Sequence, residues 1–407
     1  TAILSAQQQK VTLNLQQQVQ ELKAQQGTLR LLVQGEPKSV AEVAKLCNGR
    51  LVYAAGKICS VEIPATQFDT FIADERINRV EGGKRRNQLL NDTMKTVHQV
   101  NEVRNGQSPL PQGYNGSGVI VGIIDSGVDF THPDLQDTAG KTRVLFLWDQ
   151  RESVGPPSPS PFTYGVEWTK TKIDSGLCTH NDLAYYGHGT GVCGIAAGDG
   201  SSTNARDFSG VAPESKLIVV ALDFAGQNSP VAVADAAAYI FAKAQALGMP
   251  CVINASVGDY YGSHDGTDLQ AQLIDNLLIA QNGRSMVGAV GNAGNLPIHL
   301  SYPLTADTNL TFFVPPTSGA IYIQLWADTN NFQNGKMAVG ATQHTPVYQD
   351  RDRTNFTTIS QNLASTSTDT LWHTNGQRLA LVQRHATIQG SAYSMEYYII
   401  PDSVTNY

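Results

Sequence analysis

The feature that most constrains the fold is a series of short apolar runs between residues 118 and 290, separated by longer amphipathic segments. The run GVIVGIID (118–125) is too short for a helix and rich in β-branched residues, so it predicts a strand buried on both faces. Three similar runs lie at 216–223, 250–258 and 285–292. Helical patterns separate them at 230–248 and 268–283. Strands joined by helical crossovers predict an α/β fold with a parallel sheet.

Polar residues stand at the ends of these predicted strands. Ligands bind parallel sheets beyond the carboxyl ends of the strands, where the sequence has Asp125, Asn254 with Ser256, and Asn292. A buried carboxylate such as Asp125 suits the task of orienting an imidazole and stabilising its protonated form. The alternative is an ordinary turn-forming aspartate, because the turn SGVD (126–129) follows directly.

A histidine and an asparagine lie in glycine-rich segments of the same region. His188 stands in GHGTGVCGIAAG (187–198), where the glycines leave room for a substrate backbone to approach the ring. A lone histidine is more often structural, but a core residue would not be expected on a polar glycine-rich loop. Asn292 lies in AVGNAGN (289–295), where its amide could donate a hydrogen bond to a developing oxyanion or simply form a turn.

The flanking segments predict two further units. Residues 28–81 have the pattern strand, helix, two strands, helix, strand, which is a βαββαβ unit. Residues 82–87 (GGKRRN) are unpatterned and basic, as an exposed linker should be. Beyond residue 303 the helical pattern is replaced by short β-rich runs such as NLTFFV (309–314), which indicates a β-sandwich or jelly roll. The predicted organisation is a Gln-rich helix, an α+β domain with its linker, an α/β domain and an all-β region, at 1–27, 28–91, 92–302 and 303–407.

Composition excludes several classes of protein. The 28 Lys and Arg against 35 Asp and Glu give a net charge of −7, so no basic surface is available for nucleic acid. No apolar run reaches the roughly 18 residues that span a bilayer. The five cysteines are odd in number and widely spaced, so they predict neither a disulfide framework nor a zinc cluster. We therefore expect no nucleic-acid partner and no membrane span.

Six motifs in a fixed order carry a resemblance to a known family. They are DSG (125–127), HPDL (132–135), GHGT (187–190), GVAP (210–213), NASVG (254–258) and GN (291–292). Together they resemble the motifs of subtilisin-like serine proteases, and the resemblance extends over residues 28–300. It implies a subtilisin-like catalytic domain. It also makes residues 28–91 similar to the family's propeptide, which is an intramolecular chaperone and inhibitor.

The resemblance implies a role for each matched residue. Asp125 would orient and stabilise the base, His188 would act as general base and then acid, and Asn292 would line the oxyanion hole. Ser256-Val257-Gly258 resembles the segment that pairs with the substrate backbone. Ala225-Gly226-Gln227 would form the opposing edge, so that a peptide binds as an added strand.

The nucleophile is where the sequence departs from the family. No segment of the 407 residues resembles the family's Gly-Thr-Ser-Met-Ala-x-Pro motif. The nearest imitation contains Ser391, but it precedes a strand-like run rather than opening a helix. Some bacterial subtilases resemble this chain in carrying a jelly-roll insertion between the oxyanion asparagine and the serine. By that resemblance the serine lies beyond Tyr407, and we expect the 407 residues alone to be inactive.

Two functions from different classes follow. The first is a secreted or cell-envelope serine endopeptidase made as a zymogen, whose partners are a polypeptide substrate and its own propeptide (28–91). Its activating cleavage is expected between Gly82 and Asp92, for instance beside Arg85-Arg86. The second is an inactive pseudoprotease that binds peptides or a partner through the same groove. The first needs no cofactor; structural calcium is common in the resembled family, but no run here matches a calcium loop.

Overall fold

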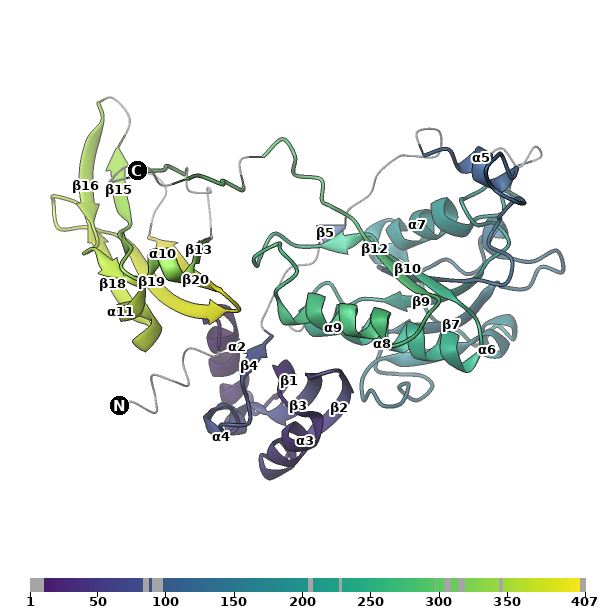
Figure 1. Cartoon of the computed structure of the whole chain (residues 1–407), viewed down its shortest axis with the longest axis horizontal. Coiled ribbons are helices and arrows are strands. Elements are labelled where there is room, and N and C mark those ends of the chain that lie inside the picture. Colours follow the sequence, from purple (N-terminus) through teal and green to yellow (C-terminus); the bar gives the residue numbers. More distant parts are fainter. Residues whose placement is uncertain are drawn as a thin grey trace.

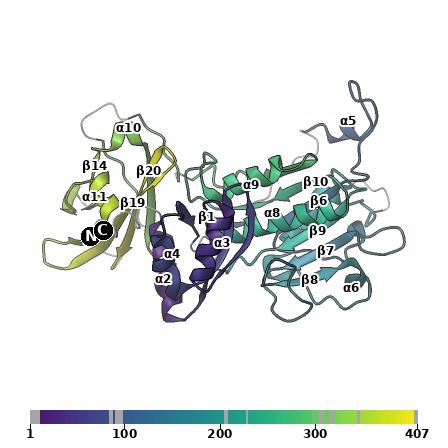
Figure 2. The same cartoon turned by 60° about the horizontal axis from the view of Figure 1, so that its bottom comes forward.

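The computed structural model describes residues 11–82, 88–89, 98–203, 208–226, 229–296, 298–303, 309–313, 319–343 and 347–402. These residues form three units, which we call the N-terminal unit (11–82), the central unit (98–303) and the C-terminal unit (319–402). The N-terminal unit lies between the other two (Figures 1 and 2). It therefore contacts both of them.

The N-terminal unit is a four-stranded antiparallel sheet with the strand order β2-β3-β1-β4. In chain order its elements are α2 (Leu13–Ala24), β1 (Thr28–Gln34), α3 (Pro37–Leu46), β2 (Arg50–Ala55), β3 (Ile58–Pro64), η1 (Ala65–Gln67), α4 (Phe68–Ala73) and β4 (Arg79–Glu81). Its own helices cover one face of the sheet, with Val40 and Phe71 in the core. From β1 to β4 the order is strand, helix, two strands, helix, strand.

The Gln-rich segment forms α2. The helix begins at Leu13, where the side chain of Thr12 accepts a hydrogen bond from a backbone N–H of the first turn. Leu15 and Val19 are buried, and their spacing of four residues places them on one side of the helix; Val11 is buried just before it. Residues 1–10 of the predicted segment lie outside the described residues.

The central unit is built on a six-stranded sheet with the order β12-β10-β6-β9-β7-β8. The strands are β6 (Ile120–Asp125), β7 (Val144–Asp149), β8 (Val166–Thr169), β9 (Lys216–Ala221), β10 (Cys251–Ala255) and β12 (Arg284–Gly288). All neighbours are parallel except β8, which is antiparallel to β7. The predicted purely parallel sheet was therefore wrong at this edge. An irregular loop rather than a helix joins β7 to β8, so the alternation of strands and helices did not reveal them.

Helices cover both faces of this sheet. α7 (His188–Ala197) packs on one face, and α8 (Ser229–Ala246) and α9 (Leu269–Ile279) pack on the other. The outer sides of α8 and α9 carry the N-terminal unit, whose second sheet face contributes Leu32 and Ile58 to a shared core. The short elements are α5 (Val100–Arg104), η2 (Pro133–Leu135), α6 (Lys170–Asp174), η3 (Leu183–Tyr185), and the paired strands β5 (Gln88–Leu89) and β11 (Val257–Gly258).

One strand that the sequence predicted to be buried is exposed. β12 ends at Gly288 rather than at residue 292, and Val287 is 57% exposed. The neighbouring Val252 of β10, which faces the same way, is 39% exposed. The described residues therefore leave one face of β10 and β12 uncovered.

The C-terminal unit is all β except for two short helices. Its main sheet is antiparallel with the order β13-β20-β19-β18. Its elements are β13 (Ile321–Asp328), α10 (Thr329–Phe332), β14 (Lys336–Met337), β15 (Gly340–Gln343), β16 (Gln349–Arg353), β17 (Thr357–Thr358), α11 (Ile359–Ala364), β18 (Ser367–Trp372), β19 (Arg378–Gln389) and β20 (Ala392–Pro401). The run at 309–314 was predicted to be a strand, but its described residues 309–313 pair with no other strand that the structure describes.

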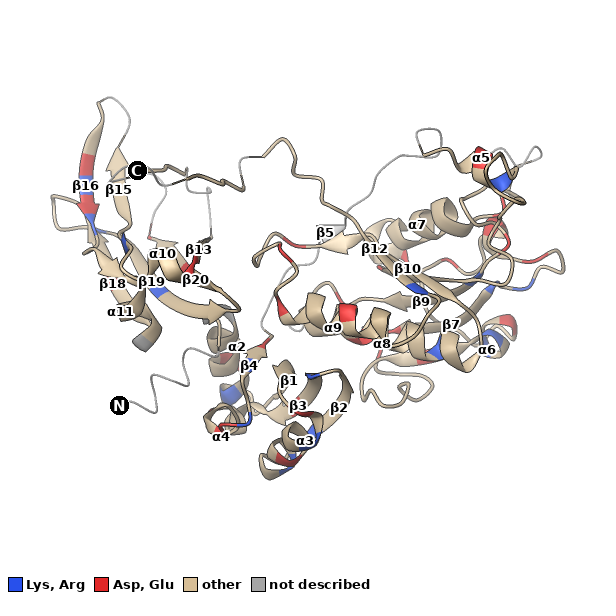
Figure 3. Cartoon of the chain, viewed as in Figure 1, with Lys and Arg blue, Asp and Glu red and all other residues tan. Residues whose placement is uncertain are grey.

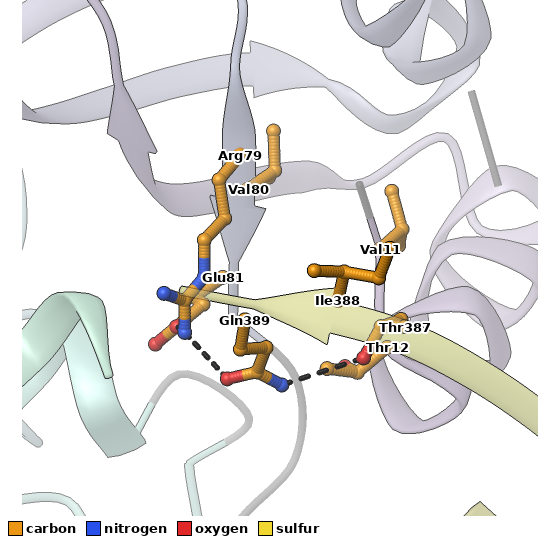
Figure 4. Close-up of a pocket in the computed structure, with 8 residues that line it drawn as sticks. All are labelled: Val11, Thr12, Arg79, Val80, Glu81, Thr387, Ile388 and Gln389. Carbon is orange, nitrogen blue, oxygen red and sulfur yellow. Dashed lines mark hydrogen bonds and ion pairs between the residues drawn. The ribbon is translucent and has the colours of Figure 1, made fainter. Parts of the chain in front are cut away.

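The three units meet around Arg79 of β4. Its guanidinium donates to Gln389 of β19 (Figure 4) and to Glu81. It also donates to the carbonyl of Thr267, 2.9 Å away, just before α9. Glu81 in turn accepts the N–H of Leu269, the first residue of α9, at 2.9 Å. One buried ion pair thus links the N-terminal unit to both neighbours.

Charged residues are spread over all three units, with Lys and Arg interspersed among Asp and Glu (Figure 3). No described helix combines the length and apolar character that crossing a membrane requires. All five cysteines are unpaired.

Candidate active site

Asp125 and His188 face each other at the carboxyl end of β6. Asp125 is the last residue of that strand and is fully buried, and His188 is the first residue of α7. His188 Nδ1 lies 2.8 Å from Asp125 Oδ1, which is hydrogen-bonding distance. The structure thus brings together two residues that are 63 positions apart in the chain.

The environment of His188 favours its protonated form. The hydrogen bond to Asp125 raises the pKa of His188, while partial burial of the ring opposes this rise. His188 Nε2 is buried and has no hydrogen-bond partner among the described residues. Because Nδ1 is held by the carboxylate, Nε2 is the nitrogen that remains available to accept a proton.

A second acidic residue, Asp182, joins the turn after Asp125 to the start of α7. Ser126 Oγ donates to Asp182 Oδ1 at 2.7 Å and accepts the N–H of Gly189 at 2.9 Å. Asp182 Oδ2 accepts from both the N–H and the hydroxyl of Thr190, each at 2.8 Å. Asp182 was not predicted from the sequence. A signal was present in the sequence: Ser126 follows Asp125 directly and Thr190 lies two residues after His188, and both hydroxyls donate to Asp182.

The segment predicted to pair with a substrate backbone pairs with another part of this chain. Val257 and Gly258 form an antiparallel pair with Leu89 and Gln88, respectively. Ser256 Oγ accepts a hydrogen bond from the Asn254 amide at 3.0 Å. β5 therefore lies along β11 in the way that an added peptide strand would.

Asn292 is not at the end of a strand. It is exposed, four residues beyond Gly288 where β12 ends, and its amide has no hydrogen-bond partner among the described residues. The preceding Gly291 has φ +97°, a backbone conformation that residues other than glycine rarely adopt. The prediction of an amide at the strand end was therefore wrong in this detail, because a turn intervenes.

The remaining candidates lie on other segments of the chain than this pair. Ala225 and Gly226 form a turn closed by the carboxylate and carbonyl of Asp223, and Gln227 lies outside the described residues. Ser391 stands in the hairpin turn between β19 and β20 of the C-terminal unit. Within the described ranges, no group of three or more His, Cys, Asp or Glu residues is placed to hold a metal ion.

Comparison with known proteins identifies the family. The model of the subtilase family, Peptidase_S8, matches residues 116–391, which is more than half of the chain. The chain belongs to the subtilase family. Subtilases are serine proteases, and the aspartate and histidine motifs described above lie within the matched residues.

Individual relatives cover this subtilase only in part. Subtilisin of Bacillus sp. (strain TA39) is 27% identical over 201 residues, which is 48% of this chain and 39% of that protein. Thermitase of Thermoactinomyces vulgaris is 30% identical over 190 residues, which is 46% of this chain and 52% of that protein. The matched regions span about half or less of these relatives. A solved structure of the Clostridium perfringens CspB protease aligns with a TM-score of 0.49 and 20% identity, over 76% of this chain and 60% of that one.

Among the described residues, no serine hydroxyl hydrogen-bonds to His188 Nε2. The described residues thus bring an aspartate and a histidine together at this candidate site without a serine at His188 Nε2. What the arrangement can do chemically is take up a proton at His188 Nε2 and hold the resulting charge against Asp125.

Proposed function

We propose that this chain is part of a subtilisin-type serine endopeptidase made as a zymogen. The observation that carries the proposal is the hydrogen bond between Asp125 and His188, with His188 Nε2 left unpartnered. The nucleophilic serine belongs to a segment beyond Tyr407. Without that segment the 407 residues cannot form an acyl-enzyme.

The proposed chemistry assigns one task to each group. His188 Nε2 takes the proton of the serine hydroxyl as its oxygen bonds to the substrate carbonyl carbon. Asp125 stabilises the imidazolium, and the Asn292 amide donates to the oxyanion once the site is closed. The imidazolium then gives its proton to the leaving amine as the C–N bond breaks. Water then attacks the acyl-enzyme with the same proton transfers through His188, and the acyl group is released.

The face of β10 and β12 that the described residues leave uncovered supports the proposal of a further segment. Val252 pairs with Val121, which packs under α7, so the bare face of β10 and β12 continues the face that carries α7. Gly191 and Gly194 on α7 also border open space, since a Cβ at either would meet nothing within 4 Å. Exposed apolar residues on a sheet face are costly in water, so this face suits a further element of the same chain.

The pairing of β5 with β11 supports the zymogen part of the proposal. Residues 88–89 follow the N-terminal unit and occupy an edge that a substrate peptide would use. We propose that residues 28–91 inhibit the enzyme in this way and that activation cuts the chain between Gly82 and Asp92. Residues 83–87 and 90–97, and with them Arg85-Arg86, lie outside the described residues.

No cofactor is required by this chemistry, because proton transfer, attack and oxyanion stabilisation use protein groups alone. Structural calcium remains an expectation from the family resemblance. We propose that the enzyme is secreted or cell-envelope bound, which cell fractionation tests. Its substrates are proposed to be polypeptides bound as an added strand along β11.

Labelling of the full-length gene product with a fluorophosphonate tests the proposal, because only an activated serine reacts. We expect covalent labelling of a serine encoded after Tyr407, and its loss in His188→Ala. The exposed His299→Ala variant is the matched control and should be labelled normally. A full-length protein that is folded and unlabelled would instead be a pseudoprotease.

A further inference from the structure

A second carboxylate–imidazole pair lies beside the first and has no task in the proposed chemistry. Asp149 ends β7 and is fully buried, and His180 Nδ1 lies 2.5 Å from its Oδ2. Arg151 holds the same carboxylate through Nε at 3.0 Å and Nη2 at 2.9 Å. Burial alone would raise the pKa of Asp149, but the hydrogen bonds from His180 and Arg151 outweigh it and keep the pKa well below its usual range.

The hydrogen bonds of His180 indicate which ring nitrogen carries the proton. The backbone N–H of Val128 donates to His180 Nε2 at 3.1 Å. A backbone amide can only donate, so Nε2 carries a lone pair and the ring proton is on Nδ1, facing Asp149. His180 thus bridges the Asp149 carboxylate and the backbone of Val128.

That bridge ends on the turn that carries Asp125. Within this turn, a Cβ on Gly127 would lie 2.6 Å from His180 Cε1 and Nε2, so the ring packs directly against the glycine. On the other side, a Cβ on Gly189 would lie 2.2 Å from the Gly127 carbonyl oxygen. The ring, the turn and the first turn of α7, which begins with His188, are therefore in continuous contact.

We propose that the Asp149–His180 pair is a positioning device for the Asp125–His188 pair. It fixes the turn from Asp125 to Val128, and through this turn it sets the hydrogen bond between Asp125 and His188. Asp149 and His180 touch neither the substrate nor the reacting atoms, so they are positioning residues. The effect on peptide hydrolysis rests on the proposed function, whereas the effect on His188 does not.

The first test uses the 407-residue chain and an NMR titration of the His188 ring. His180→Ala removes the hydrogen bonds to Asp149 and Val128. We expect the pKa of His188 to fall, because the hydrogen bond between Asp125 and His188 becomes weaker. His180→Gln can accept from Val128 and donate to Asp149, so it should restore most of the wild-type pKa. His373→Ala is the matched control, because His373 also accepts a backbone N–H, that of Asn375 at 3.2 Å, but lies in the C-terminal unit.

The second test uses the full-length protein. We expect His180→Ala to slow fluorophosphonate labelling about 10- to 100-fold, and to lower kcat for a peptide substrate with little change in KM. His180→Gln should recover most of the loss. If His180→Ala does not fold, Asp149→Asn serves in both tests. It keeps the shape of the Asp149 side chain but weakens the hydrogen bond to His180.

The outcomes separate the two proposals. A folded His180→Ala or Asp149→Asn variant with the wild-type His188 pKa and labelling rate overturns the positioning role. A wild-type full-length protein that does not react overturns the proposed function. In that case the NMR titration still decides whether His180 positions the Asp125–His188 pair.

Discussion

Asp125 and Asp149 lie on either side of the same residue, Ala221, because β6 and β7 are the two neighbours of β9. Each carboxylate holds Nδ1 of a histidine. The pairs differ at Nε2, which accepts a backbone N–H in His180 and has no partner among the described residues in His188. The His188 side chain is also 12% exposed, against 0% for His180. The lack of a partner at Nε2 among the described residues therefore distinguishes the pair suited to catalysis from the pair suited to structure.

Replacing Asp125 with Asn should slow the full-length enzyme by about 10⁴-fold, because an amide does not stabilise the imidazolium and favours the wrong tautomer of His188. The measurement is the second-order rate of fluorophosphonate labelling. Asp137→Asn, on an exposed loop, is the control and should react at the wild-type rate. A loss of less than tenfold in Asp125→Asn would contradict the catalytic role.

The rate of labelling should rise with pH as His188 loses its proton. The hydrogen bond to Asp125 raises the pKa of His188, so the midpoint should lie above the ordinary histidine value of about 6.5. The same pair stabilises the fold below the unfolded-state pKa, and this contribution is lost as pH rises through the folded-state pKa. Asp125→Asn should move the NMR midpoint of His188 down. A wild-type midpoint at or below 6.5 would rule out this account of the base.

The place of Asp125 at the edge of the sheet could be anticipated from sequence, because the apolar runs disclosed a parallel sheet and polar strand ends gather at one edge of such a sheet. Its meeting with His188 was implied by the family resemblance of the DSG and GHGT motifs. Asp149, His180 and Asp182 were not anticipated. His180 and Asp182 lie in irregular chain whose path is set by contacts with distant segments, such as the hydrogen bond from Ser126 to Asp182. Local periodicity carries no information about such contacts. The same limit hid β7 and β8.

Asp235 on α8 should make the contact with the N-terminal unit pH-dependent. Burial raises the pKa of Asp235 to about 6, and hydrogen bonds from Tyr164 at 2.8 Å and Ser60 at 3.2 Å offset this only in part. A carboxyl whose folded-state pKa is raised contributes most at low pH, and this contribution falls as pH rises from the unfolded-state pKa to about 6.

The variant Asp235→Asn isolates this effect. Its unfolding free energy relative to wild type should change by about 2 kcal/mol between pH 4 and pH 7, in favour of the variant at pH 7. Denaturant titrations at the two pH values measure it. A constant difference between the two proteins would show that Asp235 does not titrate in this window.

Removing Arg79 should weaken the junction of the three units. Arg79→Ala removes the cation that pairs with the buried Glu81 carboxylate, and breaking a buried pair in this way typically costs about 3 kcal/mol or more. Urea unfolding of the 407-residue chain measures the loss. Lys57→Ala breaks an exposed ion pair with Glu36 in the same unit and should have no measurable effect. Equal effects of the two variants would contradict the structural role of the junction.

Two glycines of α7 should respond oppositely to alanine. A Cβ on Gly189 would lie 2.2 Å from the Gly127 carbonyl oxygen, so Gly189→Ala must displace either α7 or the turn. We expect a loss of about 1–3 kcal/mol in stability and a lower pKa for His188, as its bond to Asp125 is disturbed. A Cβ on Gly191 meets nothing within 4 Å, so Gly191→Ala should leave that pKa unchanged and gain up to about 1 kcal/mol in helix stability. Thermal unfolding and NMR titration of both variants measure these effects. An unchanged His188 pKa in Gly189→Ala would mean that the contact between α7 and the turn does not set the geometry of the pair.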